Sequence, residues 1–215
     1  MSMVIAVDGP TASGKGTLAR RLAAHFGFAY LDTGSLYRAA ALRLLRAGGD
    51  GSDVAAAVTA AQGIGPDDLA DPALREEATG NMASRVAALQ PVRDALFALQ
   101  RDFAACPPAG LPGAVLDGRD IGTVVCPDAR VKLFVIADVT ARARRRHLEL
   151  TGQGREVAYE TVLRDLEARD ARDSARASAP LARADDAVLI DTTKLDIEAA
   201  FSAALEACAS RMDGS

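Results

Sequence analysis

Nine residues near the start of the chain, at positions 9–17, constrain its fold more than any other stretch. They read Gly-Pro-Thr-Ala-Ser-Gly-Lys-Gly-Thr, with a short apolar run at 3–7 before them and a helix-like run at 18–24 after them. Strand, glycine-rich loop, lysine and helix are the context of a phosphate-binding loop, where backbone N–H groups and a helix N-terminus face anionic oxygens. We therefore expect Lys15 to contact the β- and γ-phosphates of a nucleoside triphosphate and the Thr17 hydroxyl to lie near Mg²⁺.

One detail of this loop narrows the class further. Gly16 directly follows Lys15, at a position where Ser or Thr is more common. The ending Gly-Lys-Gly-Thr is the form found in nucleoside monophosphate kinases, so the loop hints at a small-molecule kinase. The simpler alternative is a glycine-rich turn with an incidental lysine.

Length, composition and charge set the remaining limits. A chain of 215 residues with 49% hydrophobic residues can form one α/β domain with inserted lobes. A net charge of -4 argues against a sequence-independent nucleic-acid binder, and no apolar run approaches a membrane span. Cys106, Cys126 and Cys208 show no metal-binding spacing, so we expect buried or partly buried thiols in a soluble, cytoplasmic monomer.

Hydrophobic patterning predicts strands that alternate with helices along the chain. We expect strands at 3–7, 28–31, 114–116, 131–136 and 186–190, and helices at 35–47, 53–62, 71–89, 91–105, 140–150, 156–171 and 196–212. This order predicts a doubly wound parallel sheet. Within a single domain spanning 1–215, we assign a core to 1–34, 107–141 and 166–215, a helical acceptor-binding lobe to about 35–106, and a small arginine-rich lid to about 142–165.

Four carboxylates follow predicted strands, at Asp8, Asp32, Asp117 and Asp138. Because the carboxyl ends of parallel strands meet at one edge, we expect these side chains at the ligand-binding edge. Asp117 has the placement of a carboxylate that organises Mg²⁺ in P-loop enzymes, directly or through water. The alternative is that Asp117 only caps a turn.

Charged residues are concentrated in three further places. The block Asp-Gly-Arg-Asp at 117–120 follows a buried strand, the stretch 169–176 alternates in sign, and 142–146 contains four arginines. Spacing predicts that residues 169, 173 and 176 share one helix face. Each group could instead be a solvated surface segment, since charge runs often are.

Another short motif points to a different class of protein. Thr-Lys-Leu-Asp at 193–196 resembles the guanine-specifying element of GTPases. No switch loop accompanies it, and Asp196 is equally well placed as a helix cap. A nucleotide-controlled switch therefore stays an alternative, as does a kinase for another small acceptor such as UMP or shikimate.

Taken together, these motifs resemble the bacterial cytidylate kinase family along most of the chain. The blocks that carry the resemblance lie at 8–17, 31–38, 81–93, 117–128, 142–146 and 169–181. Asp-Gly-Arg-Asp-Ile-Gly-Thr-Val-Val at 117–125 is far more specific than the phosphate-binding loop. The chain departs from typical members in a shortened insert, since only 63–71 stands before the helix that carries Ser84.

The resemblance implies roles for individual residues. ATP phosphates would be held by Gly9, Pro10, Thr11, Ala12, Ser13, Gly14, Lys15, Gly16 and Thr17. The acceptor's 5′-phosphate would be bound by Thr33, Arg38, Arg119 and Arg176, its cytosine by Ser84, Arg93 and Asp120, and its ribose by Arg169 and Asp173. Catalysis would rest on Lys15, Asp117, Arg119, Arg142, Arg146 and Arg176, with Mg²⁺ near Thr17 and Asp117. The implied reaction is ATP-dependent phosphorylation of CMP and dCMP.

Overall fold

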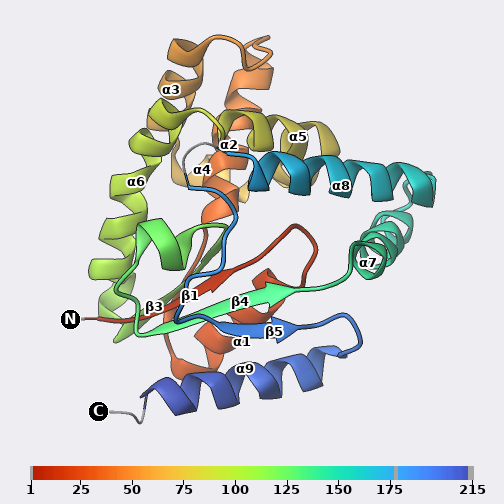
Figure 1. Cartoon of the computed structure of the whole chain (residues 1–215). Coiled ribbons are helices and arrows are strands. Elements are labelled where there is room, and N and C mark those ends of the chain that lie inside the picture. The colour runs from red at the N-terminus through yellow and green to blue at the C-terminus, as the bar shows by residue number, and fades with distance from the viewer. Residues whose placement is uncertain (1, 177–178, 213–215) are drawn as a thin grey trace.

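A five-stranded parallel sheet forms the centre of the computed structural model, which describes residues 2–176 and 179–212 (Figure 1). The parts of the sequence assignments that fall on 1, 177–178 and 213–215 lie outside this description. In spatial order the strands are β2 (Ala29–Asp32), β3 (Gly113–Gly118), β1 (Met3–Asp8), β4 (Val131–Ile136) and β5 (Val188–Asp191). The predicted α/β class and parallel sheet are confirmed.

Helices cover both faces of this sheet because the strand side chains alternate between two apolar clusters. Ile5 and Val7 of β1 belong to the cluster beneath α1 (Lys15–Phe26) and α9 (Ile197–Met212). Ala6 belongs to the other, beneath α2 (Thr33–Arg46) and α6 (Gln90–Ala105). Figure 1 shows α1 and α9 on one side of the sheet and the α2–α6 layer on the other.

The acceptor-side lobe is helical, as expected, but its middle differs from the prediction. The single helix expected over 71–89 is a 3-10 turn at Pro72–Arg75 followed by α5 (Glu77–Val86). Glu76 separates the two in an extended conformation, with φ −69° and ψ 148°. The short α4 (Pro66–Ala70) follows α3 (Val54–Gln62) and lies between the helices expected at 53–62 and 71–89, where no helix was predicted. Its first residue is proline, which suits a helix start.

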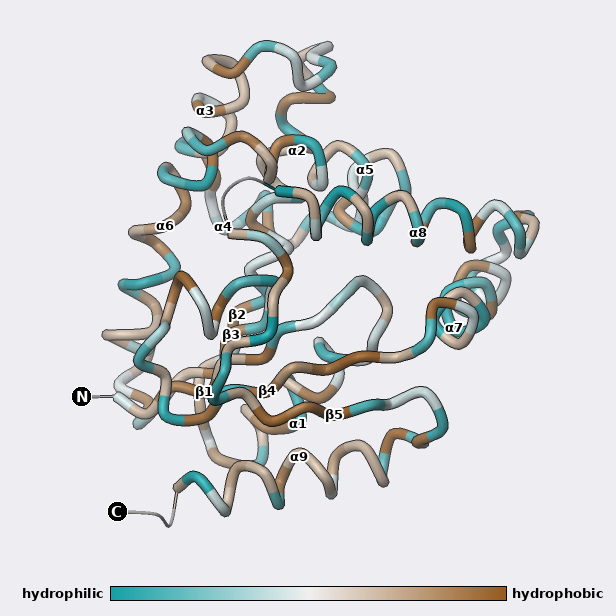
Figure 2. The backbone as a smooth tube through the Cα atoms, in the orientation of Figure 1, coloured by the Kyte–Doolittle hydropathy of each residue, from teal (hydrophilic) through white to brown (hydrophobic). Residues whose placement is uncertain are grey.

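Two helices, α7 (Val139–Gly152) and α8 (Tyr159–Ser174), extend beyond the sheet (Figure 1). Gly154 turns the chain between them with φ 78°. The predicted limits of the lid, 142 and 165, fall inside these helices. Arg176 lies two residues past the end of α8, so the prediction that it shares a helix face with residues 169 and 173 is wrong. Figure 2 shows α8 as largely hydrophilic and the strands as largely hydrophobic.

The carboxyl ends of the strands meet as expected. Asp32 and Val7 both pair with Asp117 across the sheet, and Asp8 pairs with Gly118. A π-helical turn at Ile121–Val125, not foreseen in the sequence, follows this edge. Among the described residues no helix is both long and apolar enough to span a membrane. Cys126 and Cys208 are buried, whereas Cys106 is exposed, against expectation.

Candidate active site

The phosphate-binding loop joins β1 to α1 and needs glycine where the sequence provides it. Gly9 has φ 156°, and a Cβ there would collide with the carbonyl oxygen of Val135. Gly14 has φ 90° at the N-cap of α1, and Lys15 is the first residue of that helix. Ala12 has φ 61°, a left-handed conformation that costs an L-residue about 1–2 kcal/mol. The loop is therefore bent around a helix N-terminus, as a phosphate cradle requires.

The unusual Gly16 is explained by its neighbour across the sheet. A Cβ on Gly16 would lie 3.2 Å from Oδ2 of Asp117 and 3.8 Å from the Tyr30 hydroxyl. That hydroxyl donates a hydrogen bond to Oδ1 of Asp117 at 3.0 Å. A Ser or Thr at position 16 would press on this carboxylate, so glycine lets Asp117 approach the loop.

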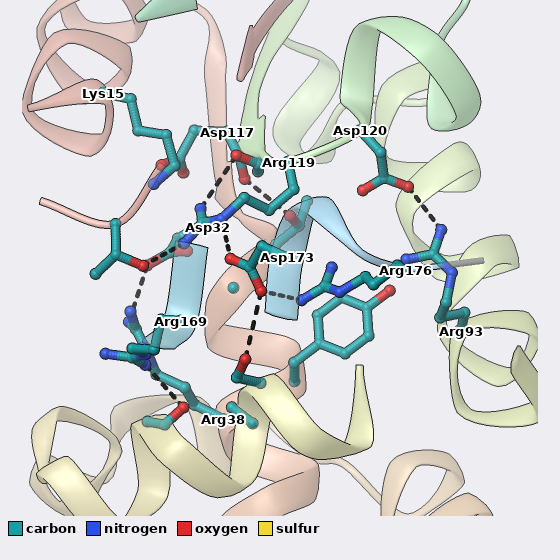
Figure 3. Close-up of a pocket in the computed structure, with 18 residues that line it drawn as sticks. Lys15, Asp32, Arg38, Arg93, Asp117, Arg119, Asp120, Arg169, Asp173 and Arg176 are labelled. Carbon is teal, nitrogen blue, oxygen red and sulfur yellow. Dashed lines mark hydrogen bonds and ion pairs between the residues drawn. The ribbon is translucent and has the colours of Figure 1, made fainter. Parts of the chain in front are cut away.

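Lys15 and Asp117 influence each other's charge at the floor of the cleft (Figure 3). Loss of water lowers the pKa of Lys15, and nearby Arg119 lowers it further. Burial raises the pKa of Asp117, with Asp32 adding to the rise. An arriving triphosphate or a cation at this point reverses these shifts by supplying the missing opposite charge.

The residues around Asp117 fit Mg²⁺. The Asp117 carboxylate and the Thr17 hydroxyl line the same cleft, and both offer the oxygen ligands that Mg²⁺ prefers. No group of three or more His, Cys, Asp or Glu that could hold a metal occurs in the described part of the chain. Mg²⁺ in kinase sites needs only one or two protein ligands beside substrate phosphates, so this absence does not conflict with the fit.

The structure brings all nine predicted acceptor residues into one pocket (Figure 3). They come from α2, α5, α6, the segment after β3, α8 and the segment after α8. They are Thr33, Arg38, Ser84, Arg93, Arg119, Asp120, Arg169, Asp173 and Arg176. Lys15 and Asp117 line the same pocket, which therefore adjoins the phosphate-binding loop.

This pocket suits an anion even though the chain as a whole is acidic. It contains six cationic and four anionic side chains: Lys15, Arg38, Arg93, Arg119, Arg169 and Arg176 against Asp32, Asp117, Asp120 and Asp173. The Nε atoms of Arg93, Arg169 and Arg176 are buried without a hydrogen-bond partner among the described residues. Because an unsatisfied buried donor costs about 1–3 kcal/mol, these atoms favour a ligand rich in acceptors.

Asp173 organises the arginines at the centre of the pocket. Its Oδ2 accepts from Nε of Arg119 at 2.8 Å, and its Oδ1 accepts from Nη2 of Arg176 at 2.5 Å. The Ser84 hydroxyl donates to Oδ1 at 3.3 Å. The neighbouring arginines lower the pKa of Asp173 against the effect of burial, so the carboxylate is ionised and holds both guanidinium groups in place.

The predicted base-reading residues form a pair of their own at the far side of the pocket (Figure 3). Nη2 of Arg93 donates to Oδ2 of Asp120 at 2.6 Å, with both side chains buried. Asp120 directly precedes the π-helical turn, whose N–H groups at Ile121 and Gly122 donate to Asp8 at 2.8 and 2.7 Å. Burial raises the pKa of Asp8 to about 7, against those two backbone hydrogen bonds.

The two arginines assigned to catalysis in the lid differ from each other. Arg146 is half-buried; it reaches Glu77 of α5 at 3.3 Å and pairs with Glu149 of its own helix at 2.9 Å. Arg142 is buried, and its guanidinium contacts the carbonyl groups of Ala137 and Thr11. Arg142 also forms a bidentate pair with Asp170.

A second hollow lies on the other side of the loop and is mainly apolar. Its lining includes Leu18, Leu195, Ile197 and Ala200, with Arg145 and Thr192 at its edge. Asp196, which also lines it, accepts a hydrogen bond from the Ala199 N–H at 2.8 Å. The helix-cap interpretation of Asp196 is thus confirmed, and the hollow can take a flat ring next to the loop.

Four residues at the site were given no role from the sequence. Glu77 joins Arg146 and Arg169 at 3.3 and 3.8 Å. The Tyr30 hydroxyl donates a hydrogen bond to Asp117. Asp8 accepts two backbone N–H groups from the turn after Asp120. Asp170 forms an ion pair with Arg142. Asp8 was placed at this edge but given no role. Asp170 stands in the same charged stretch as Arg169 and Asp173, which was the one available signal.

The fold and the site together define a P-loop kinase of the nucleoside monophosphate kinase type. The sequence matches the Cytidylate kinase family over residues 5–210, and the chain belongs to that family. It is 56% identical over 204 residues to a cytidylate kinase of Rhodospirillum rubrum, covering 95% of this chain and 96% of the relative. It is 58% identical over 212 residues to that of Xanthobacter autotrophicus, covering 99% and 100%.

Solved structures agree on the fold. The chain resembles an uncharacterized protein from Eubacterium ventriosum with a TM-score of 0.55 and 17% identity, covering 98% of this chain and 100% of that one. It resembles the protein TT1252 from Thermus thermophilus with a TM-score of 0.53 and 20% identity, covering 99% of both chains. At these identities the likeness supports the architecture alone.

Proposed function

We propose that the protein transfers the γ-phosphoryl group of ATP to CMP and dCMP, giving CDP or dCDP and ADP. The observation that carries the proposal is the single pocket, next to the phosphate-binding loop, that gathers all nine acceptor residues. Its excess of arginines suits a 5′-phosphate, and the buried Arg93–Asp120 pair supplies a donor and an acceptor for a base edge.

The reaction needs orientation and charge neutralisation rather than a strong base. An oxygen of the acceptor phosphate, already anionic, forms a bond to the γ-phosphorus in line with the departing bridge oxygen. The bond between the γ-phosphorus and the departing bridge oxygen breaks, and its electron pair stays on that oxygen in ADP. Lys15, Arg119 and Arg176 stabilise the charge that spreads over the transferred group. Thr17 and Asp117 would hold Mg²⁺, which would supply further charge neutralisation.

Each part of the cleft receives one part of the substrates in this proposal. The loop from Gly9 to Thr17 holds the ATP phosphates, and the apolar hollow beside Leu18 and Ile197 receives the adenine. Arg38, Arg119 and Arg176 hold the acceptor phosphate, and Arg169 and Asp173 contact its ribose. Arg146 closes from α7 onto the phosphates. Location in the cytoplasm and a monomeric state stay predictions from the sequence.

Initial rates with a panel of acceptors test the proposal. With ATP and Mg²⁺, CMP and dCMP are expected to give ADP at rates well above those with UMP, AMP or shikimate. Faster turnover of another acceptor would reassign the substrate. Slow ATP hydrolysis that ignores the acceptor would instead indicate a nucleotide-controlled switch.

A further inference from the structure

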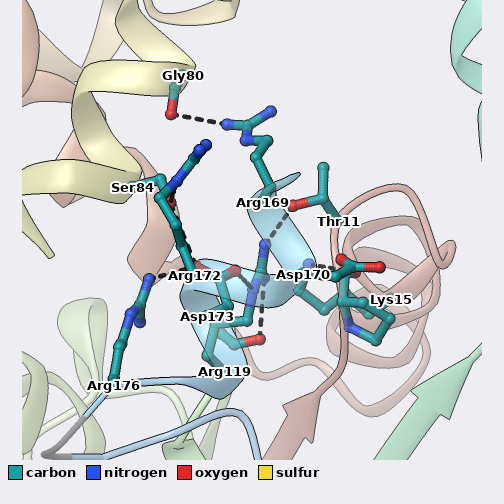
Figure 4. Close-up of polar contacts among 12 residues, drawn as sticks. Thr11, Lys15, Gly80, Ser84, Arg119, Arg169, Asp170, Arg172, Asp173 and Arg176 are labelled. Carbon is teal, nitrogen blue, oxygen red and sulfur yellow. Dashed lines mark hydrogen bonds and ion pairs between the residues drawn. The ribbon is translucent and has the colours of Figure 1, made fainter. Parts of the chain in front are cut away.

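We propose that Asp170 is a positioning residue for ATP binding: it acts through Arg142 on the backbone of the phosphate-binding loop. This rests on the proposed function only in taking ATP as the donor. Asp170 lies on α8, the helix that also carries the acceptor residues Arg169 and Asp173. Figure 4 shows Asp170 on the side of α8 toward Lys15, and Asp173 on the side toward Arg119 and Arg176.

The Arg142 side chain is almost fully engaged by protein groups. It is only 4% exposed. Nε donates to the carbonyl of Ala137 at 2.9 Å, Nη1 donates to Asp170 at 3.2 Å, and Nη2 donates to Asp170 at 2.5 Å. Nη1 also donates to the carbonyl of Thr11 at 3.1 Å. Four of the five N–H donors of a guanidinium are thus used by protein acceptors.

The contact of Arg142 with Thr11 sets the orientation of one peptide group of the loop. A peptide group is planar and trans, so its C=O and N–H point in opposite directions. Arg142 holds the Thr11 carbonyl toward α7, and the N–H of Ala12 in the same peptide therefore points away from α7. The next residue along, Ala12, has the left-handed φ of 61°. Such a conformation persists only where its surroundings enforce it, and the Arg142 contact supplies that constraint.

A parallel contact on the same loop supports this interpretation. The carbonyl of Ser13 accepts from the Thr192 hydroxyl at 2.9 Å, and Arg145 donates to that hydroxyl at 3.1 Å. Two carbonyls of the loop are therefore held from outside by arginines of α7, one directly and one through Thr192. Carbonyls held outward do not compete with phosphate oxygens for the loop's remaining N–H groups; those of Ser13 and Thr17 already donate to the carbonyls of Pro10 and Gly14 at 3.5 and 3.1 Å.

The direction in which an Asp170 substitution changes ATP affinity distinguishes this positioning role from direct contact between Arg142 and phosphate. Asp170→Asn removes a negative charge near the triphosphate, so simple Coulomb attraction predicts equal or tighter ATP binding. If Arg142 contacted phosphate itself, loss of its competing carboxylate would also favour tighter binding. If Asp170 positions the loop through Arg142, binding weakens instead.

The experiment is calorimetric titration of the full-length protein with the Mg²⁺ complex of a non-hydrolysable ATP analogue, and separately with CMP. For Asp170→Asn we expect the Kd of the analogue to rise about tenfold and the Kd of CMP to change less than twofold. Amide hydrogen exchange of the segment 9–17 is expected to speed up. An unchanged or lower Kd for the analogue would overturn the proposal, and so would equal losses for both ligands.

Two variants on the same helix serve as controls. Glu167→Gln makes the same charge change at an exposed position of α8 and is expected to leave both dissociation constants within twofold. Asp173→Asn is expected to show the opposite pattern, weakening CMP far more than the analogue. If Asp170→Asn does not fold, Asp170→Glu, which keeps the charge but displaces the carboxylate, carries the same test. Failure of the wild type to bind CMP would count against the proposed function and leave the analogue result standing.

Discussion

The proposed donor loop, 9–17, and the proposed acceptor pocket adjoin each other at one edge of the sheet, but they are built in different ways. The donor loop is one run of nine residues that offers mainly backbone groups to its ligand. The acceptor pocket takes nine side chains from six segments between Thr33 and Arg176. A backbone cradle recognises any triphosphate, whereas a set of fixed side chains can distinguish one acceptor from another. Specificity is therefore expected to reside in the acceptor pocket and chemistry at the junction of the two.

The largest effect tests the donor side of this comparison. Lys15→Ala removes the only lysine of the loop and should lower kcat at least about 100- to 1,000-fold, the effect of losing one group that stabilises transition-state charge. The fold should survive, because within the described residues the half-buried ammonium makes only one hydrogen bond, a long one of 3.4 Å to the Pro10 carbonyl. Steady-state rates together with thermal unfolding check this, and near-normal turnover in a folded variant would remove Lys15 from the chemistry.

The next effect tests the acceptor side. Arg176→Ala deletes a charge assigned to the acceptor phosphate and should raise the KM for CMP about 10- to 100-fold, as for a lost charge-assisted hydrogen bond. The KM for ATP should stay within about threefold. Arg183→Ala, at an arginine whose Nε bonds the Ala187 carbonyl away from the pocket, provides the matched control. Equal rises in both KM values would place Arg176 with the ATP-binding arginines.

Discrimination between cytosine and uracil gives a test with a smaller expected effect but a more specific outcome. A carboxylate at position 120 can accept from the cytosine amine but faces a carbonyl oxygen in uracil, a mismatch worth about 1–3 kcal/mol. Asp120→Asn should therefore narrow the ratio of kcat/KM for CMP over UMP, mainly by loss of CMP activity. The ion pair of Asp120 with Arg93 at 2.6 Å supports a rival role, in which Asp120 only stiffens the pocket. The rival predicts equal losses for both substrates.

The last effect bears on stability rather than turnover and concerns the link between the two sites. Asp8 ends β1 just before the donor loop and accepts N–H groups from the turn after Asp120. Its pKa is raised from 3.8 to about 7 mainly by burial, so the folded protein binds a proton that the unfolded chain releases at lower pH. This stabilisation is complete below about pH 4 and is lost as pH rises through 7.

Urea unfolding at several pH values measures this link. Relative to Asp8→Asn, the wild type should lose roughly 2–3 kcal/mol of unfolding free energy between pH 5 and 8. The free energy of unfolding falls as pH rises because the native state binds more protons than the unfolded state in this range. Parallel pH profiles for the two proteins would show that Asp8 ionises in the folded chain as readily as in water.

The two sites also differ in how far the sequence predicts them. The loop from Gly9 to Thr17 and the strand-end carboxylate Asp117 follow from local patterns, because their neighbours in space are neighbours in sequence or lie at the same edge of a parallel sheet. The acceptor set came from resemblance, and the structure gathers it in one pocket. Local sequence patterns do not identify the hydrogen-bond or ion-pair partner of each charged side chain. Arg142 and Thr11 are 131 positions apart, and Arg146 and Glu77 are 69 apart.

The break between 71 and 89 illustrates the same limit. Helical periodicity continues across Glu76, so local pattern alone favours one helix. The extended backbone at Glu76 allows α5 to lie against both α2 and α8, which places Ser84 beside Asp173. Tertiary packing thus overrides propensity at the point where the acceptor pocket is assembled.

Equilibrium binding to crossed variants tests the division between donor and acceptor sites most directly. Calorimetry with CMP alone and with the Mg²⁺ complex of a non-hydrolysable ATP analogue alone would be carried out on Lys15→Ala and Arg176→Ala. The account predicts that Lys15→Ala weakens only the analogue and Arg176→Ala weakens only CMP, each by at least about tenfold. Comparable weakening of both ligands by either variant would contradict a donor site and an acceptor site that bind separately.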